Sequence, residues 1–106
     1  MLVRLATLVA LFAACSTANP TGLEPMECPP TGTPLTYANF GDELIAAKCL
    51  DCHDRTGPVL TTQAAIQSHA TAILHEAVYT DAMPENADMF LAEREKLGEW
   101  IACGAP

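Results

Sequence analysis

The sequence predicts a small all-α protein. Four segments, at about 37–51, 62–68, 70–79 and 91–102, have the apolar spacing and the end signals of helices. No run of alternating apolar and polar residues is convincing enough to indicate a strand. The chain has 106 residues and only 6% of them are aromatic, so a core made of protein alone would be thin. We therefore expect a disulfide, a metal or a cofactor to complete the interior.

The N-terminus has the features of an export signal. Arg4 is followed by an uncharged apolar run from Leu5 to Ala14. This run is too short to span a bilayer, and it has the length of the apolar core of a signal peptide. A buried amphipathic helix is the alternative, but the run is apolar on every side. We expect residues 1–14 to be a signal peptide and the mature chain to act outside the cytoplasm.

Two processing sites are compatible with this signal. The letters LFAAC, which end at Cys15, resemble a bacterial lipobox, in which the cysteine is acylated and becomes the first mature residue. The letters STA also fit ordinary cleavage after Ala18. Cys15 lies at the very end of the apolar run, which favours the lipoprotein. The protein would then be anchored to a bacterial membrane by lipid only, in the periplasm or on the outer surface.

The segment that follows is rich in proline. Five of the eight prolines of the chain fall within residues 16–35. Such a composition favours an extended tether, so we expect residues 15–35 to connect the N-terminus to a globular domain at 36–106. The net charge of −8 argues against nucleic acid as a partner. A protein partner with a basic docking patch would complement this charge.

The chemistry of the chain centres on the letters CLDCH, from Cys49 to His53. The spacing allows a redox dithiol, half of a zinc site, or covalent attachment of a haem. Export makes a reducing dithiol less natural, and no βαβ pattern surrounds the motif. Zinc would need a second ligand pair, but His69 and His75 are six residues apart, outside the usual spacing. Residues three and four apart share a helix face, so Cys49 and Cys52 can reach the two haem vinyl groups while His53 binds the iron.

At these residues the chain resembles the small class I c-type cytochromes, and the resemblance covers the whole predicted domain. In that family a glycine lies eight residues before the first haem cysteine, and Gly41 holds this place. The family's C-terminal helix crosses the first helix at the glycine, where a missing Cβ lets two backbones approach closely. The letters REKLGEWIACGAP fit that helix, with Leu97, Trp100 and Ile101 on one face and Gly104 as the C′ residue. The resemblance implies a small cytochrome c-like helical fold wrapped around one covalently bound haem.

The second axial ligand is expected at Met83, in the letters TDAMPEN, 30 residues beyond His53. Pro84 keeps Met83 out of a helix, and members of the family present a ligand thioether from a Met-Pro pair like this one. The alternative role for Met83 is to fill a gap under a loop. The alternative ligands are His69, His75 and Met89.

The resemblance also predicts the surroundings of the haem. In the family a proline in the loop after the haem histidine offers its carbonyl to the second ring nitrogen, and Pro58 is the candidate here. The alternative for Pro58 is plain turn chemistry. We expect an apolar cleft between His53 and Met83. Its predicted lining is Leu44, Pro58, Leu60, Ile66, Ile73, Val78 and Leu97.

The ligand set decides the predicted function. A haem with both axial positions filled has no vacancy for a substrate, so it moves electrons instead. The resemblance therefore implies a single-electron carrier, not an enzyme, with redox proteins as partners. Without Met83 as a ligand the iron would be five-coordinate, as in a gas sensor or a weak peroxidase. A further alternative is an electron-transfer subunit of a larger dehydrogenase or oxidase complex.

Two cysteines are left once the haem motif and Cys15 are assigned. In an oxidising compartment we expect Cys28 and Cys103 to form a disulfide that joins the proline-rich segment to the end of the C-terminal helix. The bridge would close a loop of about 76 residues, for which chain entropy suggests roughly 4–5 kcal/mol of stabilisation as an upper value. The two Cα atoms should then lie within about 7 Å of each other. The alternatives are two unpaired thiols, or a bond from Cys28 to another chain.

Overall fold

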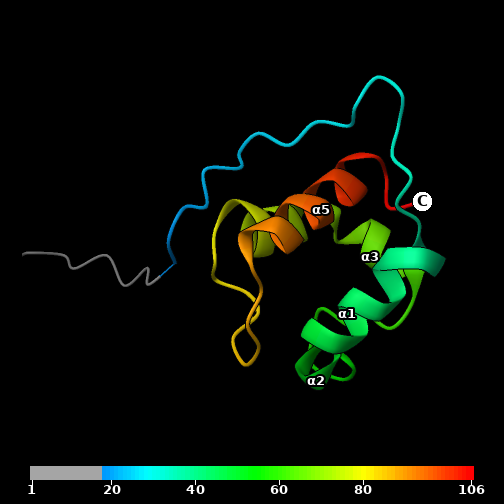
Figure 1. Cartoon of the computed structure of the whole chain (residues 1–106). Helices are drawn as coiled ribbons and strands as arrows, with labels where there is room; N and C mark the ends of the chain where they lie inside the picture. Colours follow the sequence, from blue (N-terminus) through cyan, green and yellow to red (C-terminus); the bar gives the residue numbers. More distant parts are fainter. Residues whose placement is uncertain (1–17) are drawn as a thin grey trace, which may run out of the picture.

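A computed structural model describes residues 18–106, and within them the chain is helical (Figure 1). Its elements, in chain order, are η1 (Tyr37–Gly41), α1 (Asp42–Lys48), α2 (Leu50–His53), α3 (Gln63–Ser68), α4 (Ala70–Ile73), η2 (Leu74–Tyr79) and α5 (Leu91–Ala102), where η marks a π-helix. The described part has no strand, only an isolated bridge between Pro20 and Thr80. The predicted all-α class is confirmed. The predicted signal peptide and Cys15 lie outside the described residues.

The first helical stretch runs from η1 through α1 to α2. It begins with a capping box, in which the Thr36 hydroxyl accepts the N–H of Asn39 and the Asn39 side chain accepts the N–H of Thr36. The helix is interrupted at Cys49, which has φ −122° and ψ −36°, and resumes for one turn in α2. The sequence predicts one helix at 37–51, whereas the observed stretch ends at His53 and is broken at Cys49. The break places Cys52 and His53 on a turn of their own.

The middle of the chain forms two further helical pieces. Thr62 caps α3 by accepting the N–H of Ala65. His69 separates α3 from α4, and its Nδ1 lies 2.8 Å from the Ala65 carbonyl oxygen. Helix α4 continues directly into η2, so residues 70–79 are helical throughout, as predicted. The buried residues of this segment are Ile73, Ala77 and Val78.

Helix α5 packs on η2 and α4, and it carries the largest core side chain. Leu97, Trp100 and Ile101 are buried, as their spacing predicts. A Cβ on Gly41 would lie 2.3 Å from two ring atoms of Trp100, so the glycine makes room for the indole. The resemblance predicts a close approach of two backbones here, but the structure places a ring against a backbone. Gly104 has φ +94°, the left-handed conformation of a C′ glycine.

The core is small and is closed by the end of the chain. The Ala105 carbonyl accepts the side-chain amide of Gln63 at 3.0 Å. The Pro106 carbonyl accepts the backbone N–H of Tyr37 at 2.6 Å and the indole N–H of Trp100 at 3.1 Å. These bonds join η1, α3 and α5 around one set of apolar side chains. The buried apolar residues are Ile45, Leu60, Ile66, Ile73, Ala77, Val78, Met89, Leu97, Trp100, Ile101 and Ala105.

Residues 19–35, here called the strap, run along α5 and form no helix (Figure 1). The sequence predicts an extended tether, and the strap is extended, but it also contacts the helices. The Thr21 N–H donates to the Tyr79 carbonyl at 3.0 Å, and the Met26 N–H donates to the Tyr79 hydroxyl at 3.1 Å. Met26 packs on Gly98 of α5, where a Cβ would lie 2.8 Å from its Cγ. The strap therefore forms part of the globule.

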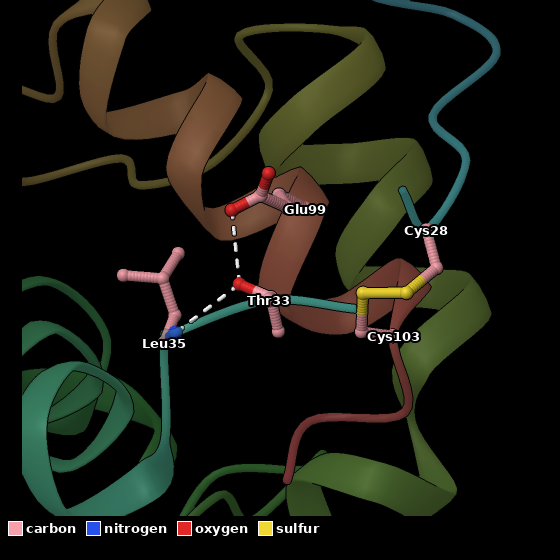
Figure 2. The surroundings of a disulfide bond; sticks show 5 residues. All are labelled: Cys28, Thr33, Leu35, Glu99 and Cys103. Atoms are coloured by element: carbon pink, nitrogen blue, oxygen red, sulfur yellow. Dashed lines mark hydrogen bonds between the residues drawn. A yellow bond between two sulfur atoms is a disulfide. The ribbon is translucent and has the colours of Figure 1, made fainter. Parts of the chain in front are cut away.

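The predicted disulfide between Cys28 and Cys103 is present, with the two Cα atoms 4.7 Å apart. Figure 2 shows it at the end of α5, near Thr33 and Glu99. The Thr33 hydroxyl donates to Glu99 Oε2 at 2.9 Å and accepts the N–H of Leu35 at 3.1 Å. One covalent bond and one side-chain hydrogen bond thus hold the second half of the strap to the last turns of α5.

Candidate functional site

Two adjoining cavities lie between the CLDCH motif and the loop that contains Met83. The apolar cavity has a volume of about 120 Å³, and the rim cavity has a volume of about 360 Å³. Cys49, His53 and Met83 line both, so the two form one recess. The apolar cavity is further lined by Pro58, Leu60, Ala72, Ile73, Glu76, Ala77 and Leu97. The rim cavity is further lined by Lys48, Asp51, Cys52, Thr56, Gly57, Pro84, Glu85, Asn86 and Ala87.

The predicted lining of the cleft agrees in part with these cavities. The predicted residues that line the apolar cavity are Pro58, Leu60, Ile73 and Leu97. Those that do not are Leu44, Ile66 and Val78. Val78 follows Ala77 by one residue and so points to another side of η2, where it packs on Gly98. Leu44 is half-buried and lies beside Phe40 at a different hollow of the surface.

The imidazole of His53 is held in one tautomer. Its Nδ1 lies 2.9 Å from the carbonyl oxygen of Pro58 and 3.2 Å from that of Thr56. Because a carbonyl oxygen only accepts, Nδ1 is the donor in both contacts, and in the neutral ring Nε2 then keeps the lone pair. The bond to Pro58 is the one that the resemblance predicts. A carbonyl partner of this kind orients the ring and makes Nε2 a more basic metal ligand.

The two motif cysteines are free thiols, in contrast to Cys28 and Cys103. Burial raises the pKa of the Cys49 thiol to about 11. Cys52 is exposed at the edge of the rim cavity, where Asn86 Nδ2 lies 3.8 Å from its Sγ. A thiol with a raised pKa is protonated at neutral pH and is a poor nucleophile for disulfide exchange. The environment of Cys49 therefore disfavours the redox-dithiol alternative.

Met83 alone, of the four candidate ligands opposite His53, lines the recess. His69 is bonded through Nδ1 within α3 and does not reach either cavity. His75 is exposed, with its ring 3.2 Å from the carboxylate of Glu76. Met89 is buried in the core but lines neither cavity. The geometry therefore favours Met83 over the three alternatives.

The backbone of Met83 is fixed on both sides. Its N–H donates to the carbonyl of Glu76 at 2.8 Å, and its own carbonyl accepts Nη1 of Arg94 at 2.7 Å. Arg94 is not among the residues that the sequence predicts for this site. A signal for it exists, because Arg94 lies three residues before Leu97 and seven before Ile101, on the apolar face of α5. A charged side chain on such a face is a candidate for a specific buried contact.

Comparisons with known proteins add no family to this geometry: no family model matches the chain, and no match was found among curated proteins or solved structures. Within residues 18–106, no helix has the length and hydropathy needed to cross a membrane. In the same residues, no three His, Cys, Asp or Glu side chains are grouped so as to hold a metal ion.

Proposed function

We propose that the protein is a single-electron carrier with one haem c, attached through Cys49 and Cys52 and ligated by His53 and Met83. One observation carries the proposal. His53 and Met83 lie 30 residues apart in the chain, yet they line one recess together with Cys49. Cys52 lines the outer part of the same recess. All four residues that the sequence assigns to the haem are therefore found at one place.

The residues around the recess fit this cofactor. The apolar cavity is lined mainly by apolar side chains, from α4, η2, α5 and the loops that carry Pro58, Leu60 and Met83, and such side chains suit the face of a macrocycle. Glu76 is the one charged residue of that lining, and its carboxylate contacts the ring of His75, which is exposed. The free Nε2 of His53 and the thioether of Met83 offer a nitrogen and a sulfur donor, the pair that c-type electron carriers use.

A bound haem c supplies an iron that gains and loses one electron. The residues of the chain then have separate roles. His53 would bind the iron through Nε2, because Pro58 holds its Nδ1–H and keeps the ring oriented. Met83 would supply the second ligand, which would leave no vacancy for a substrate, and a thioether ligand would raise the reduction potential relative to a second imidazole. The buried side chains of Leu60 and Leu97 exclude water from the apolar cavity.

The location and the partners belong to the same proposal. Attachment of c-type haem occurs outside the cytoplasm, and a disulfide suits an oxidising compartment. The mature protein is therefore exported to the periplasm or the outer surface and is held at the membrane by a lipid on Cys15. Its partners are redox proteins with basic docking patches. The net charge of −8 and the acidic residues Asp51 and Glu85 at the rim cavity, beside Lys48, support this choice.

Optical spectra of the exported protein, oxidised and reduced, test the proposal. We expect a six-coordinate haem c. Its ferric form should show the weak absorption band near the red edge of the visible spectrum that marks Met–iron ligation. Met83→Ala should abolish this band and keep the haem, whereas His75→Ala should keep both. Mass spectrometry should find one haem per chain, and none when Cys49 and Cys52 are both replaced by serine.

Two results would overturn it. If the protein carries no covalent haem when it is produced in a host able to attach it, the proposed electron-carrier function is wrong. A haem protein whose unsubstituted ferric form lacks the Met–iron band would instead be a five-coordinate sensor or peroxidase. Co-purification with a dehydrogenase or an oxidase would separate a subunit of a complex from a free carrier.

A further inference from the structure

Arg94 is the buried charged residue of the described part of the chain, with an exposed fraction of 7%. Its Nη1 donates to three backbone carbonyls, those of Ala77 at 2.8 Å, Met83 at 2.7 Å and Thr80 at 3.4 Å. Neither of the two ion pairs among the described residues involves Arg94. The guanidinium thus hydrogen-bonds to the backbone that leads from the end of η2 to Met83.

Burial of this guanidinium costs free energy, so we expect Arg94 to have a role that an apolar side chain could not fill. Transfer of a guanidinium out of water is unfavourable, and here carbonyl dipoles take the place of a carboxylate partner. An apolar residue of similar size on α5 would pack equally well against the core. All three bonds come from one nitrogen, Nη1, and an apolar side chain at this position would leave these carbonyls without that donor.

We infer that Arg94 is a positioning residue for Met83, and this inference rests on the proposed haem ligation. The N–H of Met83 is bonded to Glu76 on η2, and its carbonyl is bonded to Arg94 on α5. The peptide groups on the two sides of the Met83 Cα are therefore fixed to two different helices. With both fixed, a shift of the loop backbone cannot carry Met83 away from the recess that His53 also lines.

The test compares loss of the Met–iron band with loss of helix in urea, on the haem-loaded protein. We expect the two transitions to coincide in the unsubstituted protein. In Arg94→Met and Arg94→Gln the band should disappear at a clearly lower urea concentration than the helical signal, because the loop opens first. Ile101→Ala, a core substitution away from the recess, should lower both midpoints together. Arg55→Gln, at a side chain that is 81% exposed, should move neither.

Hydrogen exchange at the amide of Met83 gives a readout that does not need the iron. If Arg94 holds the loop, exchange at this amide should accelerate by on the order of tenfold or more in Arg94→Gln, with little change at core amides of α5. Coincident midpoints in both Arg94 variants, or exchange that rises uniformly, would assign Arg94 to global stability and overturn the inference. Failure of both variants to fold with haem would have the same meaning.

The outcome for Arg94 can be separated from the outcome for the proposed function. Absence of the Met–iron band from the unsubstituted protein would refute Met83 ligation and, with it, the positioning of a ligand. Presence of the band in the unsubstituted protein, and its persistence up to helix unfolding in the Arg94 variants, would refute the positioning role alone.

Discussion

The two sides of α5 differ in what completes their packing. On one side the strap covers the helix, with Met26 on Gly98, Thr33 bonded to Glu99, and a disulfide at the end. On the other side Leu97 faces the apolar cavity, which separates it from the CLDCH motif. The protein thus fills one side with its own chain, and we propose that it fills the other side with haem. A domain with so few aromatic residues needs both additions to bury a sufficient core.

The largest expected effect comes from removing the haem from its side. Replacing Cys49 and Cys52 by serine should prevent covalent attachment and leave the recess without its filling. We expect a loss of roughly 5 kcal/mol or more, which is comparable to the whole stability of a domain of this size. Circular dichroism should then show reduced helical content and no cooperative urea transition. An unchanged urea midpoint, with the Cys28–Cys103 disulfide verified by mass spectrometry, would show that the two sides do not differ as proposed.

Much of the architecture is predictable because it depends on local spacing. The four helical segments, the buried face of α5 and the C′ glycine follow from periodicity and end signals. The bond from His53 to Pro58 is predictable from the short loop between the two residues together with the family resemblance. These features involve residues close in sequence, or one helix face at a time.

The rest depends on how the pieces pack, which no local pattern specifies. The strap has no periodicity that would reveal its contact with Gly98, because proline-rich segments present no regular face. The sequence predicts Val78 in the cleft, but the side of η2 that faces the cavity is set by the docking of α5. Arg94 captures carbonyls that become neighbours only after η2 and α5 have met.

The second largest loss of stability is expected when the covalent bond on the strap side is removed. Cys28→Ser together with Cys103→Ser should lower the free energy of unfolding by about 2–4 kcal/mol, because the unfolded chain regains the freedom that the bridge removes. The Met–iron band should be retained in the folded variant, since neither Cys28 nor Cys103 lines the recess. Urea unfolding and the ferric spectrum, measured on the same sample, check both parts. Loss of the band before unfolding would mean that the strap side controls the ligand side.

The third largest loss of stability is expected from a substitution that overpacks the contact between the strap and α5. In Gly98→Ala the new methyl group would lie 2.8 Å from Met26 Cγ and from Val78 Cγ1. Alanine gains up to about 1 kcal/mol of helix propensity over glycine, but overpacking costs about 1–3 kcal/mol, so we expect net destabilisation. A double-mutant cycle with Met26→Ala separates the two terms, because the flexible partner is then gone. Equal costs in both backgrounds would show that the strap does not press on α5 at this point.

The smallest effect lies at the start of the strap, where Asn19 meets the loop that leads to Met83. Its backbone N–H and side-chain amide donate to the carboxylate of Asp81 at 2.6 Å and 3.2 Å. The bond from the Asn19 N–H is the main reason that the pKa of Asp81 lies below its usual value. The unfolded chain therefore binds the proton more tightly than the folded one. The stabilisation is present above the unfolded pKa of about 3.9 and is lost as the pH falls through the lower folded pKa.

Because Asp81 is exposed, this contribution is screened by solvent and should be modest. We expect the urea midpoint of Asp81→Asn to be slightly below that of the unsubstituted protein at pH 6, and the difference to shrink steadily below pH 4. Asp88→Asn, at an exposed position of the same loop, is the matched control; Asn19 bonds to Asp81, so this substitution should leave the pH 6 midpoint close to that of the unsubstituted protein. A difference that stays constant from pH 6 down to pH 2 would mean that the Asn19 clamp does not depend on the charge of Asp81. The start of the strap would then be held by its backbone bonds alone, such as the one from the Asp81 N–H to the Asn19 carbonyl at 3.0 Å.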